Sequence, residues 1–168
     1  MKKLLVYFIL IGSLFFSTVS LSQNRTIIQF GNGEIKIIGY YSETLEVIPQ
    51  GKENVQVNDI GYSIGGGGYI YIRIDPVGYK TIMQINIGYS SHRALTGKIT
   101  VEPSGGGLGY ELSQRIDTDS YMCKFGDINS NMSLMSGDAF TIGVKCTNNR
   151  ASTKERITLQ NIAIYWAN

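Results

Sequence analysis

Two tyrosines and an arginine alternate along one short segment and have the side chains that a polar ligand would need. Tyr69, Tyr71 and Arg73 are separated by isoleucines in the run 69–74. In a β-strand, alternate side chains point to the same face, about 6.5–7 Å apart. Tyrosine rings can stack on a ligand while a guanidinium donates hydrogen bonds. The spacing therefore predicts a binding row for an extracellular glycan or a protein surface. The alternative is a strand that carries aromatic residues because they favour sheets.

A second segment places oxygen-bearing side chains at alternate positions. Asp127, Asn129 and Asn131 alternate, and Asp138 is the twelfth residue counted from Asp127. Alternate oxygen ligands closed by a later carboxylate are typical of calcium-binding loops. The segment resembles the start of an EF-hand loop, although Met132 stands where the turn glycine belongs and no flanking helices are expected. It predicts a low-affinity structural calcium site, and the alternative is a polar connection between strands.

The two cysteines each fall on the apolar face of an alternating segment. Cys123 lies in the run 121–125, and Cys146 ends the run 140–146. If these segments form neighbouring strands in an exported protein, an oxidising compartment would join the thiols. We therefore expect a Cys123–Cys146 disulfide, with two unpaired core cysteines as the alternative.

Few residues could carry out catalysis. His92 is the single histidine, and adjacent Ser91 would point away from it in an extended chain, so the pair does not form a dyad. Asp117 and Asp119 could act as paired carboxylates in glycoside hydrolysis, but Asp and Ser between strands are ordinary turn residues. Two cysteines and one histidine are too few for a closed zinc site. The sequence predicts a non-catalytic protein that requires no cofactor.

Period-two alternation dominates the chain and predicts the elements that would position these residues. The expected strands are 26–30, 34–39, 43–48, 54–58, 69–74, 83–89, 98–102, 108–115, 119–125, 140–146 and 157–166. Some ten strands separated by Gly, Asn, Asp and Ser predict an all-β fold, an antiparallel two-sheet sandwich of the jelly-roll kind. The apolar phase of the last strand slips at 160–161, which predicts a β-bulge. The glycine runs 65–68 and 105–107 are expected to be loops.

The start of the chain has the features of a signal peptide. Lys2 and Lys3 precede an apolar run of about 13 residues, which is shorter than a membrane span, and small residues stand at 20 and 22. We expect cleavage after residue 22, leaving a single domain, 23–168, that is secreted or held at the cell surface. Removing the two lysines leaves 13 basic and 13 acidic residues. This zero net charge argues against nucleic acid as a partner.

The last third of the chain resembles a known group of modules. The run 131–144 places a Gly-Asp turn before a strand, and the run 157–166 is a final strand that ends in Tyr-Trp. This pattern is similar to the closing strands of jelly-roll, galactose-binding-like carbohydrate-binding modules. The resemblance implies a sandwich fold and non-catalytic sugar binding, often with a structural calcium ion. It carries over no binding residue.

Two hypotheses for function follow. The first is a secreted module for recognition or adhesion that binds a glycan through the Tyr-rich face. The second is a self-assembling subunit of an extracellular filament or surface layer, joined by exchange of the N-terminal strand or by edge pairing. The segment 23–30, which is apolar at Ile27, Ile28 and Phe30, would be the exchanged strand. Asn24 and Asn131 match the glycosylation acceptor pattern, which matters only in a compartment that has the glycosylation machinery.

Overall fold

A computed structural model describes residues 24–76, 81–91, 96–103, 112–116, 122–125, 135–136, 139–147 and 156–167. These residues form eleven strands and one short 3₁₀ turn, η2 (Ser42–Thr44). The strands are β1 (Arg25–Gly31), β2 (Glu34–Gly39), β3 (Leu45–Asn58), β4 (Gly61–Pro76), β5 (Thr81–Ser91), β6 (Gly97–Pro103), β7 (Leu112–Ile116), β8 (Met122–Phe125), β9 (Met135–Ser136), β10 (Phe140–Cys146) and β11 (Arg156–Trp166).

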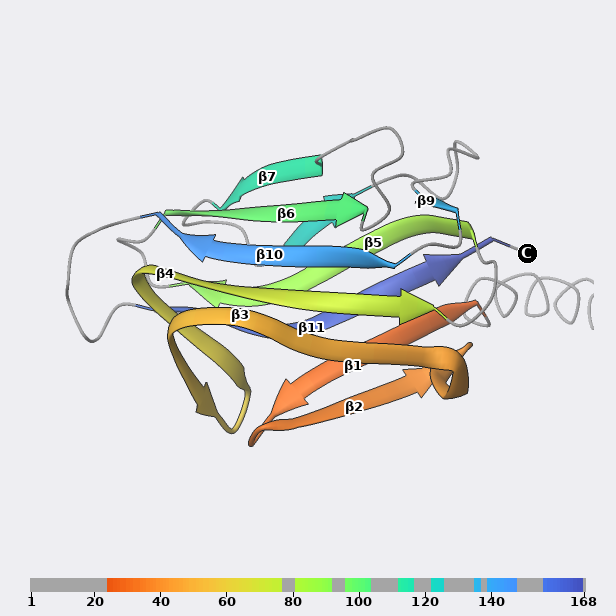
Figure 1. The fold of residues 1–168 in the computed structure, drawn as a ribbon, viewed down its shortest axis with the longest axis horizontal. Helices are drawn as coiled ribbons and strands as arrows, with labels where there is room; N and C mark the ends of the chain where they lie inside the picture. Colours follow the sequence, from red (N-terminus) through yellow and green to blue (C-terminus); the bar gives the residue numbers. More distant parts are fainter. Residues whose placement is uncertain are drawn as a thin grey trace, which may run out of the picture.

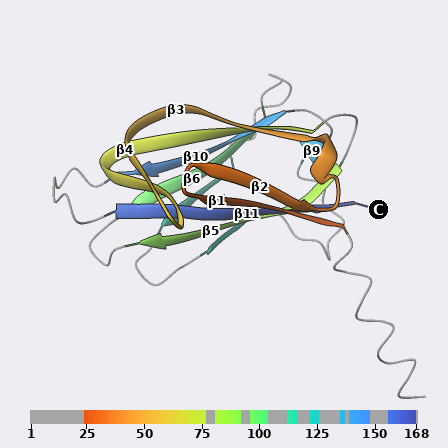
Figure 2. The ribbon, with the colours of Figure 1, turned by 90° about the horizontal axis from the view of Figure 1, so that it is seen from below.

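The strands are arranged in two layers, as Figures 1 and 2 show. We call the layer β3–β4–β10–β6–β7 the first sheet and the layer β2–β1–β11–β5–β8 the second sheet; β9 also pairs with β5. Every pairing between described strands is antiparallel. The expected antiparallel β-sandwich is therefore confirmed.

Strand β4 connects the two sheets. Its first half pairs with the start of β11, from Tyr62 to Gly65, whereas residues 69–74 pair with β10. The pairing partner of β11 changes at the same level, because β11 pairs with β4 as far as Leu159 and with β1 from Asn161 onward. The pairing of β11 with β5 is irregular between those two residues, which confirms the bulge expected there.

The expectation of a loop at 65–68 is wrong. These glycines lie inside β4, where the strand passes from one sheet to the other (Figure 1). A Cβ atom on Gly65 would lie 2.5 Å from the Asn54 amide nitrogen, and one on Gly68 would lie 2.6 Å from the Glu53 carbonyl oxygen. The glycines allow β3 to approach β4 closely through the bend, so the run serves packing within a strand. The second glycine run, 105–107, lies outside the described residues.

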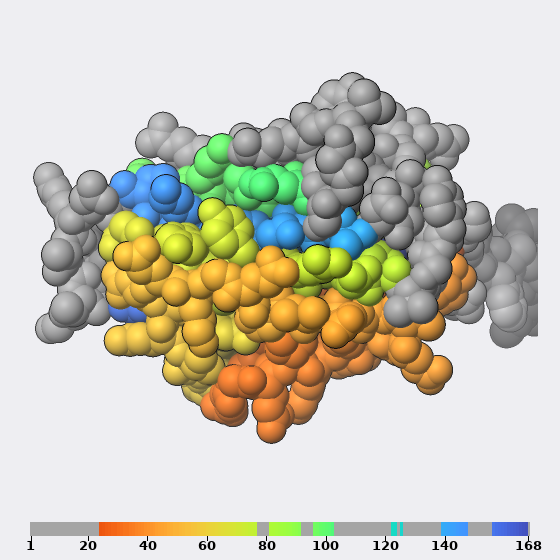
Figure 3. Space-filling model, viewed as in Figure 1, coloured from red at the N-terminus to blue at the C-terminus, as the bar shows by residue number. Residues whose placement is uncertain are grey.

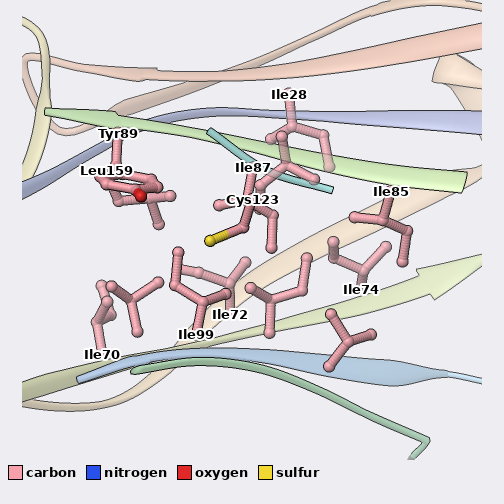
Figure 4. Packing of buried hydrophobic residues seen from close by; sticks show 14 of the residues in the cluster. Ile28, Ile70, Ile72, Ile74, Ile85, Ile87, Tyr89, Ile99, Cys123 and Leu159 are labelled. Atoms are coloured by element: carbon pink, nitrogen blue, oxygen red, sulfur yellow. The ribbon is translucent and has the colours of Figure 1, made fainter. Parts of the chain in front are cut away.

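The core fills the space between the sheets and is rich in isoleucine. Ile70, Ile72 and Ile74 of β4 are fully buried and face Ile85 and Ile87 of β5 across the sandwich (Figure 4). Each fully buried side chain of this size contributes about 1.5–3 kcal/mol through its removal from water. Alternation along β4 therefore fixes which of its faces points inward.

The predicted disulfide is also wrong, because both cysteines are free and buried. Cys123 lies on β8 opposite Ile87 in the second sheet, whereas Cys146 lies on β10 opposite Gly97 in the first sheet. The two cysteines therefore do not lie on neighbouring strands, which the prediction of a disulfide had assumed. Alternation correctly predicted two inward-facing thiols but could not show that their strands belong to different sheets.

The N-terminal strand is docked within its own chain. Strand β1 pairs with β11 on one side and with β2 on the other. The Trp166 indole nitrogen donates a hydrogen bond of 2.8 Å to the hydroxyl oxygen of buried Thr26. The expected signal segment, 1–22, lies outside the described residues. Within those residues, no helix has the length and apolar character needed to span a membrane.

Candidate ligand-binding face

The structure places Tyr69, Tyr71 and Arg73 together on the outer face of the first sheet. All three alternate with the fully buried isoleucines of β4, as the sequence predicted. The Tyr69 and Tyr71 rings contact each other, with centroids 5.3 Å apart and planes inclined at 48°. Tyr71 is 38% exposed, and Tyr69 and Arg73 are partly exposed. We call these three residues the tyrosine row.

Glycines on both neighbouring strands provide space for the Tyr71 ring. Gly143 of β10 is directly opposite Tyr71, and a Cβ atom there would lie 3.0 Å from Cε1 of the ring. A Cβ atom on Gly51 of β3 would lie 3.2 Å from Cδ2, on the other edge of the ring. The ring therefore extends over three strands, and its position depends on the absence of side chains at Gly51 and Gly143.

The guanidinium of the row is already paired with a carboxylate. Arg73 Nη2 donates a hydrogen bond of 2.9 Å to Oδ2 of Asp75, and both side chains are 38% exposed. An exposed ion pair of this kind contributes only about 0–1 kcal/mol to stability. Its main consequence is that the row presents both donors and acceptors to a ligand. Sequence reasoning missed Asp75, although the same alternation places it on this face.

Cross-strand register brings further side chains to the same surface. Opposite Arg73 lie Ile48 of β3 and Thr141 of β10. Opposite Tyr69 lie Glu53 and Lys145. Figure 3 shows that side chains of β3, β4, β10 and β6 adjoin one another on this face. These neighbours could not be inferred from the sequence, because they depend on pairing between strands that are up to about seventy residues apart.

The remaining predicted site residues cannot be compared with the structure. The calcium ligands Asp127, Asn129, Asn131 and Asp138 lie outside the described residues. His92 and the Asp117–Asp119 pair also lie in the undescribed part of the chain. In the part that is described, no three His, Cys, Asp or Glu side chains are grouped so that they could hold a metal ion.

Comparison with known proteins shows a likeness of fold. No protein-family model matches the chain, and no curated protein matches its sequence. Among solved structures, the chain is similar to a family 29 carbohydrate-binding module (14% identity, 83% of this chain and 86% of that chain, TM-score 0.49). It is also similar to the CBM32 of AlyQ, solved in complex with 4,5-unsaturated mannuronic acid (17% identity, 73% and 95%, TM-score 0.46). The similarity to carbohydrate-binding modules extends over most of the chain and not only its last third.

A further similar structure belongs to an enzyme. It is a family two carbohydrate esterase from Cellvibrio japonicus, at 8% identity and a TM-score of 0.45. The match covers 73% of this chain but only 34% of the esterase. The chain thus spans about a third of that protein.

Proposed function

We propose that this chain is a non-catalytic recognition module that binds a glycan on the outer face of the first sheet. The observation that carries the proposal is the tyrosine row, in which two contacting rings lie beside the Arg73–Asp75 pair on an exposed sheet face. The likeness to carbohydrate-binding modules concerns the fold alone. The proposal therefore depends on the side chains of this face.

The chemistry of the row fits an extended sugar chain. The C–H faces of sugar rings pack against aromatic rings, and sugar hydroxyls both donate and accept hydrogen bonds. The row has rings at Tyr69 and Tyr71, donors at Arg73 and an acceptor at Asp75. Tyr and Arg are also the residue types that most often dominate binding energy at interfaces. On the adjacent strand, Lys145 adds a polar group opposite Tyr69 and Thr141 adds one opposite Arg73.

Docking of β1 favours recognition over strand exchange. An exchanged strand must leave its own sheet, and β1 is paired on both edges, with β11 and β2. Assembly by edge pairing remains the second candidate, since β2 has β1 as its single partner among the described strands and carries the exposed Ile38. Size-exclusion chromatography distinguishes the two candidates. A recognition module elutes as a monomer, whereas an assembling subunit forms large species at micromolar concentration.

We also infer that the protein works outside the cell. A basic start, a short apolar run and small residues at 20 and 22 support export and cleavage after residue 22. N-terminal sequencing of protein recovered from the extracellular fraction tests this directly. The inference requires a mature chain that begins at Gln23, and an uncleaved chain retained in the cytoplasm would contradict it.

A screen of immobilised glycans tests the proposed function itself. We expect the purified protein to be retained by at least one class of polysaccharide, with a dissociation constant in the micromolar to millimolar range. Soluble oligosaccharide from the same polymer should release it, which separates specific binding from adsorption. Failure to bind any member of a panel that includes plant, algal, fungal and animal glycans would contradict the proposal.

A further inference from the structure

A half-open pocket of about 290 Å³ lies on the opposite side of the molecule from the tyrosine row. It forms where β11 changes partner from β4 to β1, beside the bulge at Gln160. The end of the β1–β2 hairpin and the β3–β4 turn lie next to this position, and both contribute lining residues, including Asn32 and Asp59. The pocket thus forms because the β1–β2 hairpin and the β3–β4 hairpin both end next to β11.

Three polar side chains cross the pocket in a single row. Gln29 of β1 is directly opposite Lys36 of β2 on one side and Asn161 of β11 on the other. Neighbouring strands are about 4.8 Å apart, so the three side chains are spaced to contact one small molecule. They point outward from the second sheet, because Ile28 and Ile162, their chain neighbours, are fully buried.

The surrounding backbone is held in place by its own hydrogen bonds. The Asn32 amide donates a bond of 2.8 Å to the Asn58 carbonyl oxygen, which joins the two hairpin ends. The Asn58 side-chain oxygen accepts bonds from the amides of Ile60 and Gly61 at 3.2 and 2.9 Å, which fixes the β3–β4 turn. The walls of the pocket therefore exist before any ligand binds, which reduces the entropic cost of binding.

In the described part of the lining, the polar side chains, unlike the backbone, are not held by hydrogen bonds. Among the described residues, the side chains of Gln29, Lys36 and Asn161 form no hydrogen bond or ion pair with one another or with other protein groups. Glu34 and Asp59 add two carboxylates to the described part of the lining. The pocket therefore offers amide donors, amide acceptors, one ammonium group and two carboxylates to whatever enters it.

We propose that this pocket is a second binding site, specific for a single neutral sugar residue. Two carboxylates against one ammonium group disfavour an anion. Among the described residues, the one aromatic residue in the lining is Phe30, which is 4% exposed, so stacking of a flat ring is disfavoured as well. Amide side chains match sugar hydroxyls, which donate and accept at the same atom. The volume lies near the lower end of the roughly 300–1,000 Å³ that small-ligand sites occupy.

The second site does not depend on the proposed function of the tyrosine row. The two sites face outward from opposite sheets and share no residue. If both sites bind, one protein molecule can hold two separate glycan chains or two points of one branched glycan. In the second case, binding at one site raises the effective concentration of the glycan at the other site.

Titration of the ¹⁵N-labelled protein with methyl glycosides, followed by NMR, tests the proposal. The probes are the α- and β-methyl pyranosides of glucose, galactose and mannose, each to about 50 mM. We expect at least one of them to produce saturable shifts in the side-chain amide signals of Gln29 and Asn161. Gln29→Ala should weaken this binding at least tenfold, and Lys36→Ala, at a second exposed position, should weaken it as well. Gln56→Ala, a change of the same type at an exposed position of β3, is the matched control and should leave it unchanged.

Each other result overturns the proposal. Absence of saturable shifts at the pocket with all six glycosides would exclude a sugar site there. Equal binding by Gln29→Ala, Lys36→Ala and the parent protein would place the sugar elsewhere. Loss of the same shifts in Tyr71→Ala would show that there is one site and not two. The proposed function survives the first two results, because it depends on the first sheet.

Discussion

The Cys123 thiol lies in the middle of the core, among Ile87 and its neighbours (Figure 4). Burial raises the pKa of this thiol above its ordinary value of 9.0, and a hydrogen bond with Tyr89 offsets part of the increase. Burial likewise raises the pKa of Tyr62 above 10.0. Both groups are therefore neutral in the folded protein at neutral pH, and each loses its proton at a higher pH than it would in the unfolded chain.

Alkaline pH should destabilise the protein in part through Cys123. The unfolded thiol loses its proton near pH 9.0, whereas the folded thiol keeps it to higher pH. Between the pKa of the unfolded thiol and that of the folded thiol, the unfolded state binds fewer protons, so the free energy of unfolding decreases as pH rises. The stabilisation from the buried neutral thiol is therefore complete only below pH about 9. Urea denaturation at pH 7 and pH 9.8 measures the effect. Cys123→Ala should reduce the difference between the two pH values.

The matched control for this prediction is Ile87→Val, a small core deletion at the position opposite Cys123. It should lower stability by about 0.5–1.5 kcal/mol at both pH values and leave their difference unchanged. An equal alkaline loss in Cys123→Ala and the parent protein would contradict the assignment of this effect to the thiol.

At the scale of strands, hydrogen bonds from Arg156 join β11 to the β3–β4 hairpin. Its Nη2 donates hydrogen bonds of 2.7 Å to the Ser63 carbonyl oxygen and 2.9 Å to the Asn54 carbonyl oxygen. Its Nε also donates to the Ser63 hydroxyl at 3.2 Å. One planar guanidinium thus joins the end of β3 and the start of β4, at the glycine-rich bend.

Arg156→Lys should loosen this hairpin although it preserves the charge. A lysine cannot reproduce the fork of donors, and loss of hydrogen bonds from a charged group costs about 1.5–3 kcal/mol. We expect a lower denaturation midpoint and faster amide hydrogen exchange confined to residues 54–64. Arg25→Lys is the matched control, because Arg25 lies over the Tyr165 ring at 6.0 Å without an equivalent fork. Faster exchange spread evenly over the chain would contradict the local role.

Gly51→Ala tests whether neighbouring strands set the position of the tyrosine row. The new methyl group would lie 3.2 Å from Cδ2 of Tyr71, so the Tyr71 ring must move slightly, whereas its distance of 3.6 Å from Cε2 of Tyr69 is an ordinary contact. Replacing glycine where φ allows it stabilises a protein by about 0.4–1 kcal/mol. We therefore expect severalfold weaker glycan binding with an unchanged or slightly higher melting temperature. Unaltered binding would show that the ring position is not critical.

How much the sequence predicted depends on whether a feature is local. Alternation along β4 was enough to place Tyr69, Tyr71 and Arg73 on one face and the isoleucines on the other. It also located the bulge in β11. The features that the sequence did not predict are non-local, because they depend on which strands pair. They are the neighbours of Cys123 and Cys146 and the position of the Tyr71 ring between Gly51 and Gly143. The glycine run in β4 could not be assigned to a strand from the sequence, because the need for glycine there comes from the close approach of β3.

At the scale of the whole molecule, the sandwich presents two outward faces with different chemistry. The first sheet carries contacting rings and an ion pair, suited to an extended ligand. The second sheet carries a polar pocket of limited size, suited to one sugar residue. Every described strand is paired with at least one neighbouring strand. Two outward faces of different chemistry are what the proposed recognition role requires.

The most direct test of this account compares glycan affinity in two tyrosine variants by isothermal titration calorimetry. Tyr71 and Tyr40 are equally exposed, at 38% and 37%, but Tyr40 lies outside the tyrosine row. With the best ligand from the glycan screen, Tyr71→Ala should raise the dissociation constant about tenfold or more, equivalent to about 1.4 kcal/mol. Tyr40→Ala should leave the dissociation constant unchanged, and circular dichroism should show both variants folded. Wild-type affinity in a folded Tyr71→Ala protein would contradict the central claim.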